Sequence, residues 1–213
     1  MDYYKKYKKY KNKYSKYKKE MDIGHNFIFL HMTKNLKNLK NILNDGYIKL
    51  GSEIPKEDKY LSGYEDESYI FSNIYFKDLD NLEWFNDLSL IIKPEIINEQ
   101  YVMMIGGWGN SEICIINPSD SKENKIQKLE KMKKYILDPN DLPSILLSSP
   151  KYMQHEVRFT SPIDIKKYLE GIVIGYENEN EKEEKLKKVK ELLLEFNLEK
   201  VKIYSQDKKI LLE

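Results

Sequence analysis

The stretch FIFLHMTKNLKNLKNILNDGYIKLG, residues 27–51, decides the fold because it predicts a strand, a helix and a second strand in direct succession. Its opening, FIFLHMT, is apolar, rich in aromatic residues and polar at its end, as expected of a strand. Leu36, Leu39, Ile42 and Leu43 then recur at helical spacing. A chain that alternates these elements over so few residues places a strand and a helix side by side in one core.

Capping residues flank the predicted helix. Thr33 and Asn35 are both candidates for its N-cap, since a side-chain oxygen there accepts from a free backbone N–H. Gly46 follows the last apolar position and is the expected C-cap, because glycine tolerates a left-handed conformation. The helix is therefore predicted to end before Tyr47.

Further strands and helices follow on both sides of a charged loop at residues 51–67. Strands are predicted at 68–76 (SYIFSNIYF), 88–94 (LSLIIKP), 112–118 (EICIINP), 171–176 (GIVIGY) and 200–205 (KVKIYS), and helices at 122–137 and 181–196. We interpret YVMMIGGWGN, residues 101–110, as a turn loosened by glycine. Many short strands with a few helices predict an α+β fold, with one main domain over residues 22–213.

The segment KYMQHEVRFT, residues 151–160, predicts a strand with one polar face. Alternation sends these side chains to one face of the strand: Tyr152, Gln154, Glu156 and Arg158. Met153, His155, Val157 and Phe159 take the other face. Gln154 and Glu156 therefore face either water or a substrate, and the strand pattern alone leaves both readings open.

The first 21 residues differ in texture from the rest. Tyr3, Tyr7, Tyr10, Tyr14 and Tyr17 follow the alternating four-and-three spacing of a helix seam, among lysines that give residues 1–20 a net charge of +7. This predicts a basic amphipathic helix, which either packs on the main domain or another copy, or contacts nucleic acid or a viral particle. The phrase YKKYKNKYSKYK resembles the Tyr/Lys-rich openings of proteins from giant DNA viruses of amoebae.

Composition limits the chemistry of the chain. Cys114 is the single cysteine, and three histidines complete the set of soft ligands, so we expect neither a disulfide nor a structural metal. No glycine motif for phosphate binding and no serine nucleophile elbow is present. No apolar run approaches the length of a membrane span, so the protein is expected to be soluble and intracellular, in a host cytoplasm or a virion.

Taken together, His31-x-Thr33, the phrase NLKNILNDGYI, the aromatic strand YIFSNIYF and the late segment KYMQHEVRFTSPIDIKKYLEGIVI resemble the ADP-ribosyltransferase superfamily. The resemblance runs from residue 27 to about residue 175. It implies mixed or antiparallel sheets with a few helices. It also implies a transferase that cleaves the nicotinamide–ribose bond of NAD and moves ADP-ribose to a protein or nucleic-acid acceptor.

The same resemblance implies roles for individual residues. Glu156 would stabilise the positive charge that develops on the ribose, and Gln154 would contact an acceptor of the amide or base kind. His31 would bind the adenosine ribose, with help from Thr33. In the aromatic strand, either Tyr69 or Tyr75 would stack on nicotinamide, and Ser72 between them is a further candidate for binding NAD.

The sequence leaves two alternative functions open. One is an RNA 2′-phosphotransferase, which shares this fold and uses NAD but needs more basic residues than the C-terminal half provides beside Arg158. The other is a non-enzymatic viral protein for binding or packaging, built on a decayed transferase fold and tethered by residues 1–21.

Overall fold

The computed structural model describes residues 27–33, 35–54, 68–76, 88–106, 111–137, 156–205 and 210–212. The basic helix predicted at residues 1–21 lies outside these ranges. The described residues form eleven strands, four α-helices and two 3-10 helices, and the first three elements run strand, helix, strand.

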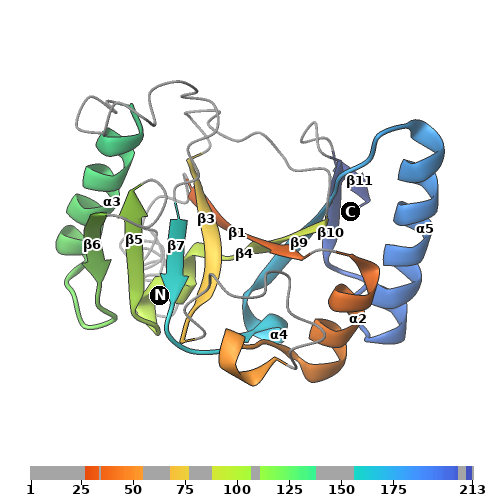
Figure 1. The fold of residues 1–213 in the computed structure, drawn as a ribbon, viewed down its shortest axis with the longest axis horizontal. Coiled ribbons are helices and arrows are strands. Elements are labelled where there is room, and N and C mark those ends of the chain that lie inside the picture. Colours follow the sequence, from red (N-terminus) through yellow and green to blue (C-terminus); the bar gives the residue numbers. More distant parts are fainter. Residues whose placement is uncertain are drawn as a thin grey trace, which may run out of the picture.

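A nine-stranded sheet forms the centre of the molecule, in the order β11-β10-β9-β4-β1-β3-β7-β5-β6 (Figure 1). Its strands are β1 (Phe27–Thr33), β3 (Ile70–Phe76), β4 (Leu88–Ile92), β5 (Val102–Gly106), β6 (Ser111–Ile116), β7 (Glu156–Phe159), β9 (Leu169–Ile174), β10 (Lys202–Ser205) and β11 (Ile210–Leu212). Neighbouring strands pair antiparallel, except β9 and β10, which are parallel. The predicted α+β class is confirmed.

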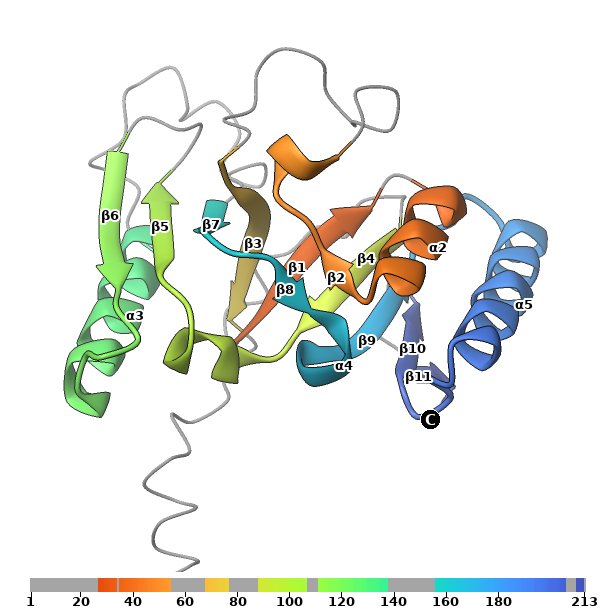
Figure 2. The same cartoon turned by 90° about the horizontal axis from the view of Figure 1, so that it is seen from below.

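Helices and a small second sheet pack on this central sheet. They are α2 (Leu36–Asp45), α3 (Lys122–Leu137), α4 (Ile165–Tyr168) and α5 (Glu179–Glu195), with β2 (Tyr47–Ile48) paired to β8 (Ile163–Asp164). Short 3-10 turns occupy Gly51–Glu53 and Pro94–Asn98. Helix α3 lies beside β5 and β6 at one end (Figure 1), while α2, α4 and the β2–β8 pair lie across one face of the sheet (Figure 2).

The burial pattern of β1 explains its central place. Phe27 and Phe29 join the main core cluster, and the Phe29 ring meets the Phe159 ring edge-on at 5.2 Å between centroids. Ile28 and Leu30 point the other way, into a second and smaller buried cluster. Because β1 is apolar on both sides, it is stable only where both faces of the sheet are covered.

The capping signals of α2 act as predicted. The Asn35 side chain accepts a hydrogen bond from the Asn38 N–H at 3.0 Å, which makes Asn35 the N-cap. Gly46 has a φ of 75° and its N–H donates to the Ile42 carbonyl at 3.0 Å. Leu39 and Leu43 are buried by this helix against the main core.

Strands β1 and β3 pair with each other along only half of their length. Paired positions of β1 and β3 run from Phe27↔Phe76 to Leu30↔Asn73. Beyond that point β1 continues along β4 to Thr33↔Leu88, while β3 continues along β7 to Ile70↔Phe159. The sheet is therefore split between the end of β1 and the start of β3, where His31 and Tyr69 are located.

Some of the sequence predictions differ from the structure. The turn predicted at residues 101–110 is wrong for its first half, because Val102–Gly106 forms β5 between β6 and β7. The apolar residues of this segment pair with β6 on one side and β7 on the other, and this pairing stabilises a strand despite the glycines that follow. The last predicted strand, β10, is followed by a further strand, β11, and the short elements α4 and β8 were not predicted.

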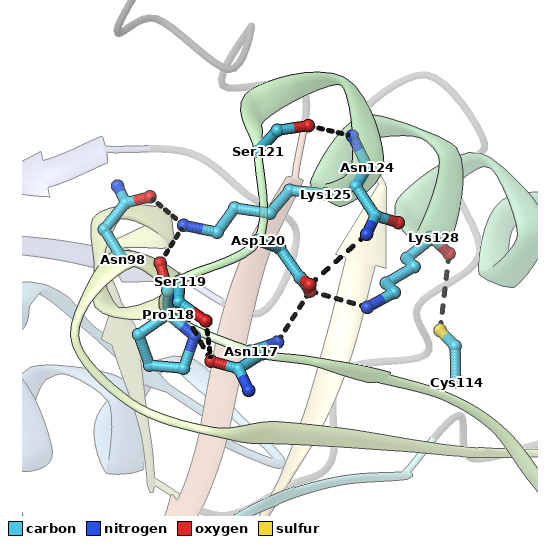
Figure 3. Close-up of polar contacts among 10 residues, drawn as sticks. All are labelled: Asn98, Cys114, Asn117, Pro118, Ser119, Asp120, Ser121, Asn124, Lys125 and Lys128. Carbon is cyan, nitrogen blue, oxygen red and sulfur yellow. Dashed lines mark hydrogen bonds and ion pairs between the residues drawn. The ribbon is translucent and has the colours of Figure 1, made fainter.

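A network of polar side chains fixes α3 to the loop before it (Figure 3). The Lys125 ammonium is buried, with 5% of the residue exposed, and donates to Asn98 Oδ1 at 2.9 Å and to the Pro118 carbonyl at 2.8 Å. Asp120 accepts from the Asn117 N–H at 2.8 Å and pairs with Lys128 at 2.5 Å. These contacts compensate the charges that the loop withdraws from water.

We predict that Lys125→Met destabilises the fold by about 1–3 kcal/mol, because two acceptors lose a charged donor in a buried place. Urea unfolding at pH 7 measures this change. Lys134→Met is the control, since Lys134 is exposed on the same helix and its loss should change stability by less than about 0.5 kcal/mol. Equal effects of the two substitutions would contradict a stabilising role for the buried ammonium.

Candidate functional site

Strand β7 presents the polar face that its sequence predicts. Val157 and Phe159 are fully buried in the main core, whereas Glu156 and Arg158 are only partly buried on the other face. Two neighbouring strands hold this short strand in place: Glu156 lies opposite a residue of β3 and a residue of β5. The two-faced pattern is confirmed for the described part of the segment.

Glu156 and Arg158 form an ion pair on that face. The Arg158 Nε–H donates to Glu156 Oε1, and the two side chains keep 20% (Arg158) and 25% (Glu156) of their area exposed. Two residues apart on a strand, they are neighbours on one side of the backbone. Because both charges are largely removed from water, each of them depends on the other for compensation.

Two aromatic rings complete this corner of the site. The Arg158 Cζ atom lies 5.2 Å from the ring centroid of Phe71 and 5.6 Å from that of Tyr69. The two rings meet edge-on at 6.5 Å between centroids. The guanidinium is therefore held by a carboxylate and by two ring systems, which together favour a flat cation.

His31 contacts β3 across the split through the backbone of Phe71. Its Nδ1 lies 2.8 Å from the Phe71 carbonyl oxygen. A carbonyl only accepts, so the hydrogen of the ring sits on Nδ1 and the lone pair of the neutral ring sits on Nε2. Burial lowers the pKa of His31, and the hydrogen bond to Phe71 opposes part of that shift. At neutral pH the ring therefore offers Nε2 as an acceptor.

The predicted residues Thr33 and Ser72 lie on the core side of the sheet. Ser72 is opposite Val157, and the alternation of β1 sends Thr33 to the same side as Phe29. Both residues are buried, at 3% exposure for Thr33 and 4% for Ser72, and among the described residues neither hydroxyl has a hydrogen-bond partner. Such hydroxyls are places where a water or a ligand supplies the missing partner.

The two candidate tyrosines lie in different surroundings. Tyr69 lies beside Arg158, on the face that carries Glu156. Tyr75 is 7% exposed and packs in the second buried cluster with Ile28 and Leu30. Gln154, the other predicted catalytic residue, lies outside the described residues.

Phe71 and Arg158 are the site residues that sequence reasoning missed. Phe71 contributes two different groups to the site: its backbone carbonyl accepts from His31, and its ring lies against Arg158. A signal for Arg158 existed in the composition, because it is the only arginine among the 36 Lys and Arg residues of the chain. The cross-strand register that brings Phe71 opposite Arg158 had no such signal.

Among the described residues, no group of three or more His, Cys, Asp or Glu side chains is placed to hold a metal ion. The helices in those ranges include none that is both long and apolar enough to cross a membrane.

Comparison with known proteins assigns the family. Residues 24–139 match the model of a family of unknown function, DUF5846, and the chain belongs to that family. It is 32% identical over 178 residues to the uncharacterized protein R11 of Acanthamoeba polyphaga mimivirus. That alignment covers 82% of this chain but 64% of R11, so the chain spans less than two thirds of its relative.

Among solved structures, the chain is similar to DarT of Thermus sp. 2.9 in complex with NAD+, with a TM-score of 0.48 and 16% identity. That match covers 79% of this chain and 90% of DarT. A second similar structure is the same DarT in complex with ADP-ribosylated ssDNA, with a TM-score of 0.47, 14% identity, and coverage of 79% of this chain and 89% of that one.

The lowered pKa of His31 predicts a pH dependence of stability. The folded state resists protonation of His31, so the unfolded chain binds more protons once the pH falls below about 6.5. The contribution is complete above that pH and is lost as the pH falls toward the lowered pKa. His31→Asn keeps an N–H near the position of Nδ1 but does not titrate.

Urea unfolding at pH 7.5 and pH 5.5 tests this sign. The unaltered protein should lose up to about 1 kcal/mol more stability between these two values than His31→Asn. The other two histidines are present in both proteins, so their titration cancels in the comparison. An equal loss in both proteins would show that His31 is not held in its neutral form.

Proposed function

We propose that this protein is an NAD-dependent ADP-ribosyltransferase, with Glu156 as its central catalytic residue. The observation that carries the proposal is the shared use of Phe71: its carbonyl binds His31, and its ring packs on the arginine that is paired with Glu156. His31 and Glu156, 125 positions apart in the chain, are thereby both linked to one residue of β3, His31 directly and Glu156 through Arg158. These two are the residues to which the family resemblance gives roles in holding NAD.

The reaction proposed for the site is a displacement at the anomeric carbon of the nicotinamide ribose. The bond from that carbon to the nicotinamide nitrogen breaks, and nicotinamide leaves with the electron pair as a neutral molecule. The acceptor forms the new bond to carbon and gives up its proton. The ribose passes through an oxocarbenium-like state, and a carboxylate fixed beside it lowers the barrier because it opposes the new positive charge.

Glu156 has the surroundings that this role requires. It lies on an interior strand and is positioned by the β3 and β5 pairings rather than by a loop, so its carboxylate enters the reaction with little freedom left to lose. Its described ion pair with Arg158 uses Oε1. Oε2 is the oxygen that we assign to the ribose of the substrate.

The neutral His31 suits a different part of the dinucleotide. Its Nε2 accepts a hydrogen bond from a hydroxyl group, and we assign it to the adenosine ribose. Thr33 of β1 and Ser72 of β3 have buried hydroxyls on the core side of the sheet that lack partners among the described residues, and we propose that they support the NAD site from beneath the two strands. Tyr69, on the Glu156 side, is proposed to stack on the nicotinamide ring.

We predict that Glu156→Gln lowers the release of nicotinamide from NAD by about 100-fold or more, because the neutral amide cannot oppose the developing charge. Release is measured by chromatography, with NAD alone and with single-stranded DNA, RNA or cell lysate as the source of acceptor. Glu195→Gln serves as the control, since Glu195 is an exposed carboxylate on α5 paired with Lys40 at 3.0 Å.

Equal release by the unaltered protein and Glu156→Gln would remove Glu156 from the mechanism. A complete lack of NAD binding by the unaltered protein would leave the fold without this chemistry and favour the binding or packaging role.

Gln154 precedes Glu156 by two residues and is proposed to contact the acceptor. We predict that Gln154→Ala lowers the transfer of ADP-ribose to an acceptor by about tenfold while it changes nicotinamide release to water less than threefold, since release does not need the acceptor. Incorporation of labelled ADP-ribose, measured beside nicotinamide release, separates the two effects. A parallel loss of both would place Gln154 at the NAD itself.

A further inference from the structure

We infer that Tyr69, Phe71 and Glu156 form a binding site for a flat organic cation, and that the Arg158 guanidinium occupies this site as an internal ligand. The inference rests on the proposed function in one respect only, which is the identity of the natural ligand. The nicotinamide ring of NAD is itself a flat, positively charged ring.

The geometry around Arg158 is that of a ligand in a site. The guanidinium has a carboxylate at Nε and two aromatic rings within 5.6 Å of Cζ. Its side chain is 20% exposed, so most of its contacts are with the protein and not with water. A guanidinium and a pyridinium are both planar and delocalised, and aromatic rings with a nearby carboxylate attract both for the same reasons.

The use of arginine at position 158 supports a requirement for a planar cation. Arg158 is the only arginine in a chain that otherwise meets every need for a positive charge with lysine. Among the described residues, two other cation–ring contacts are made by lysine, each over one ring: Lys167 over Tyr168 and Lys182 over Tyr176, both at 5.2 Å. A compact ammonium suffices at those places, whereas a planar group is needed where two rings and a carboxylate converge.

Occupancy by Arg158 has a consequence for ligand choice. A cationic ring that enters this site has to displace the guanidinium, so a small cation gains little from binding to the unaltered protein. A ligand with further contacts, such as those proposed at His31, offsets the displacement. Arg158 therefore makes the site select for a whole dinucleotide over its nicotinamide fragment.

The first experiment measures the binding of 1-methylnicotinamide, a flat cation, by calorimetry or NMR titration. Arg158→Ala should bind it about tenfold more tightly than the unaltered protein, because the site is vacated. Neutral nicotinamide has nearly the same shape and should show less than a twofold change. The gain should disappear in the double variant Arg158→Ala/Glu156→Gln, which lacks the carboxylate.

Two further variants serve as a control and as a second test of the site. Lys167→Ala removes a cation that also lies over a tyrosine, but at another place, and should leave 1-methylnicotinamide binding unchanged. Arg158→Lys keeps the charge and loses the planar group, so it should give a smaller gain than Arg158→Ala and remains available if the alanine variant fails to fold. Circular dichroism of each variant checks the fold before titration.

The natural cation is either the nicotinamide ring or the guanidinium of an acceptor side chain. The affinities for NAD+ and NADH distinguish the two, since the reduced nicotinamide ring is neutral. A gain in NAD+ affinity over NADH in Arg158→Ala would support the site and assign it to nicotinamide. A gain for 1-methylnicotinamide and methylguanidinium, with the NAD+ to NADH ratio unchanged, would support the site and assign it to the guanidinium of an acceptor side chain.

No gain in 1-methylnicotinamide affinity in a folded Arg158→Ala or Arg158→Lys protein would overturn the inference. This readout requires no turnover, so it stays separate from the test of catalysis. Loss of nicotinamide release in Glu156→Gln concerns the proposed reaction, whereas the affinity of Arg158→Ala for a small cation concerns the site.

Discussion

The hydrogen bond from His31 Nδ1 to the Phe71 carbonyl is the interaction on which the candidate site depends. It forms where the ladder between β1 and β3 has ended, so it joins two strands that otherwise follow different neighbours. The bond fixes the orientation and tautomer of the His31 ring. It also ties that ring to the strand whose next-door partner, β7, carries Glu156. Without the split, the backbone groups of β1 and β3 would pair with one another.

Partial burial shapes the electrostatics on both sides of this bond. His31 is driven toward its neutral form by burial, which suits it to accept a hydrogen bond from a ligand hydroxyl. Glu156 and Arg158 form an ion pair, and the rings of Tyr69 and Phe71 lie beside the guanidinium. One side of the split thus offers an uncharged acceptor and the other a carboxylate beside aromatic rings. The adenosine ribose and the cationic nicotinamide ring of NAD are the parts that we propose to bind there.

Local signals predicted the elements that depend on local interactions. Asn35 and Gly46 bounded α2 correctly because capping is a matter of a few neighbouring atoms, and the alternation of Glu156 to Phe159 followed from strand geometry alone. Elements that exist through distant partners were missed: β8 needs β2, and β5 needs both β6 and β7. The same limit applies to the site. Glu156, His31 and Tyr69 were found by pattern and resemblance, but the meeting of Phe71 with Arg158 depends on the β3–β7 register, which no short stretch of sequence contains.

The most direct test of the central claim is a crystal structure of the protein with a non-hydrolysable NAD analogue. We expect the anomeric carbon of the nicotinamide ribose to face the Glu156 carboxylate and the adenosine ribose to bond to His31 Nε2. We also expect the nicotinamide ring to replace the Arg158 guanidinium beside Tyr69 and Phe71. An analogue bound elsewhere, with the Glu156–Arg158 pair intact, would contradict this arrangement.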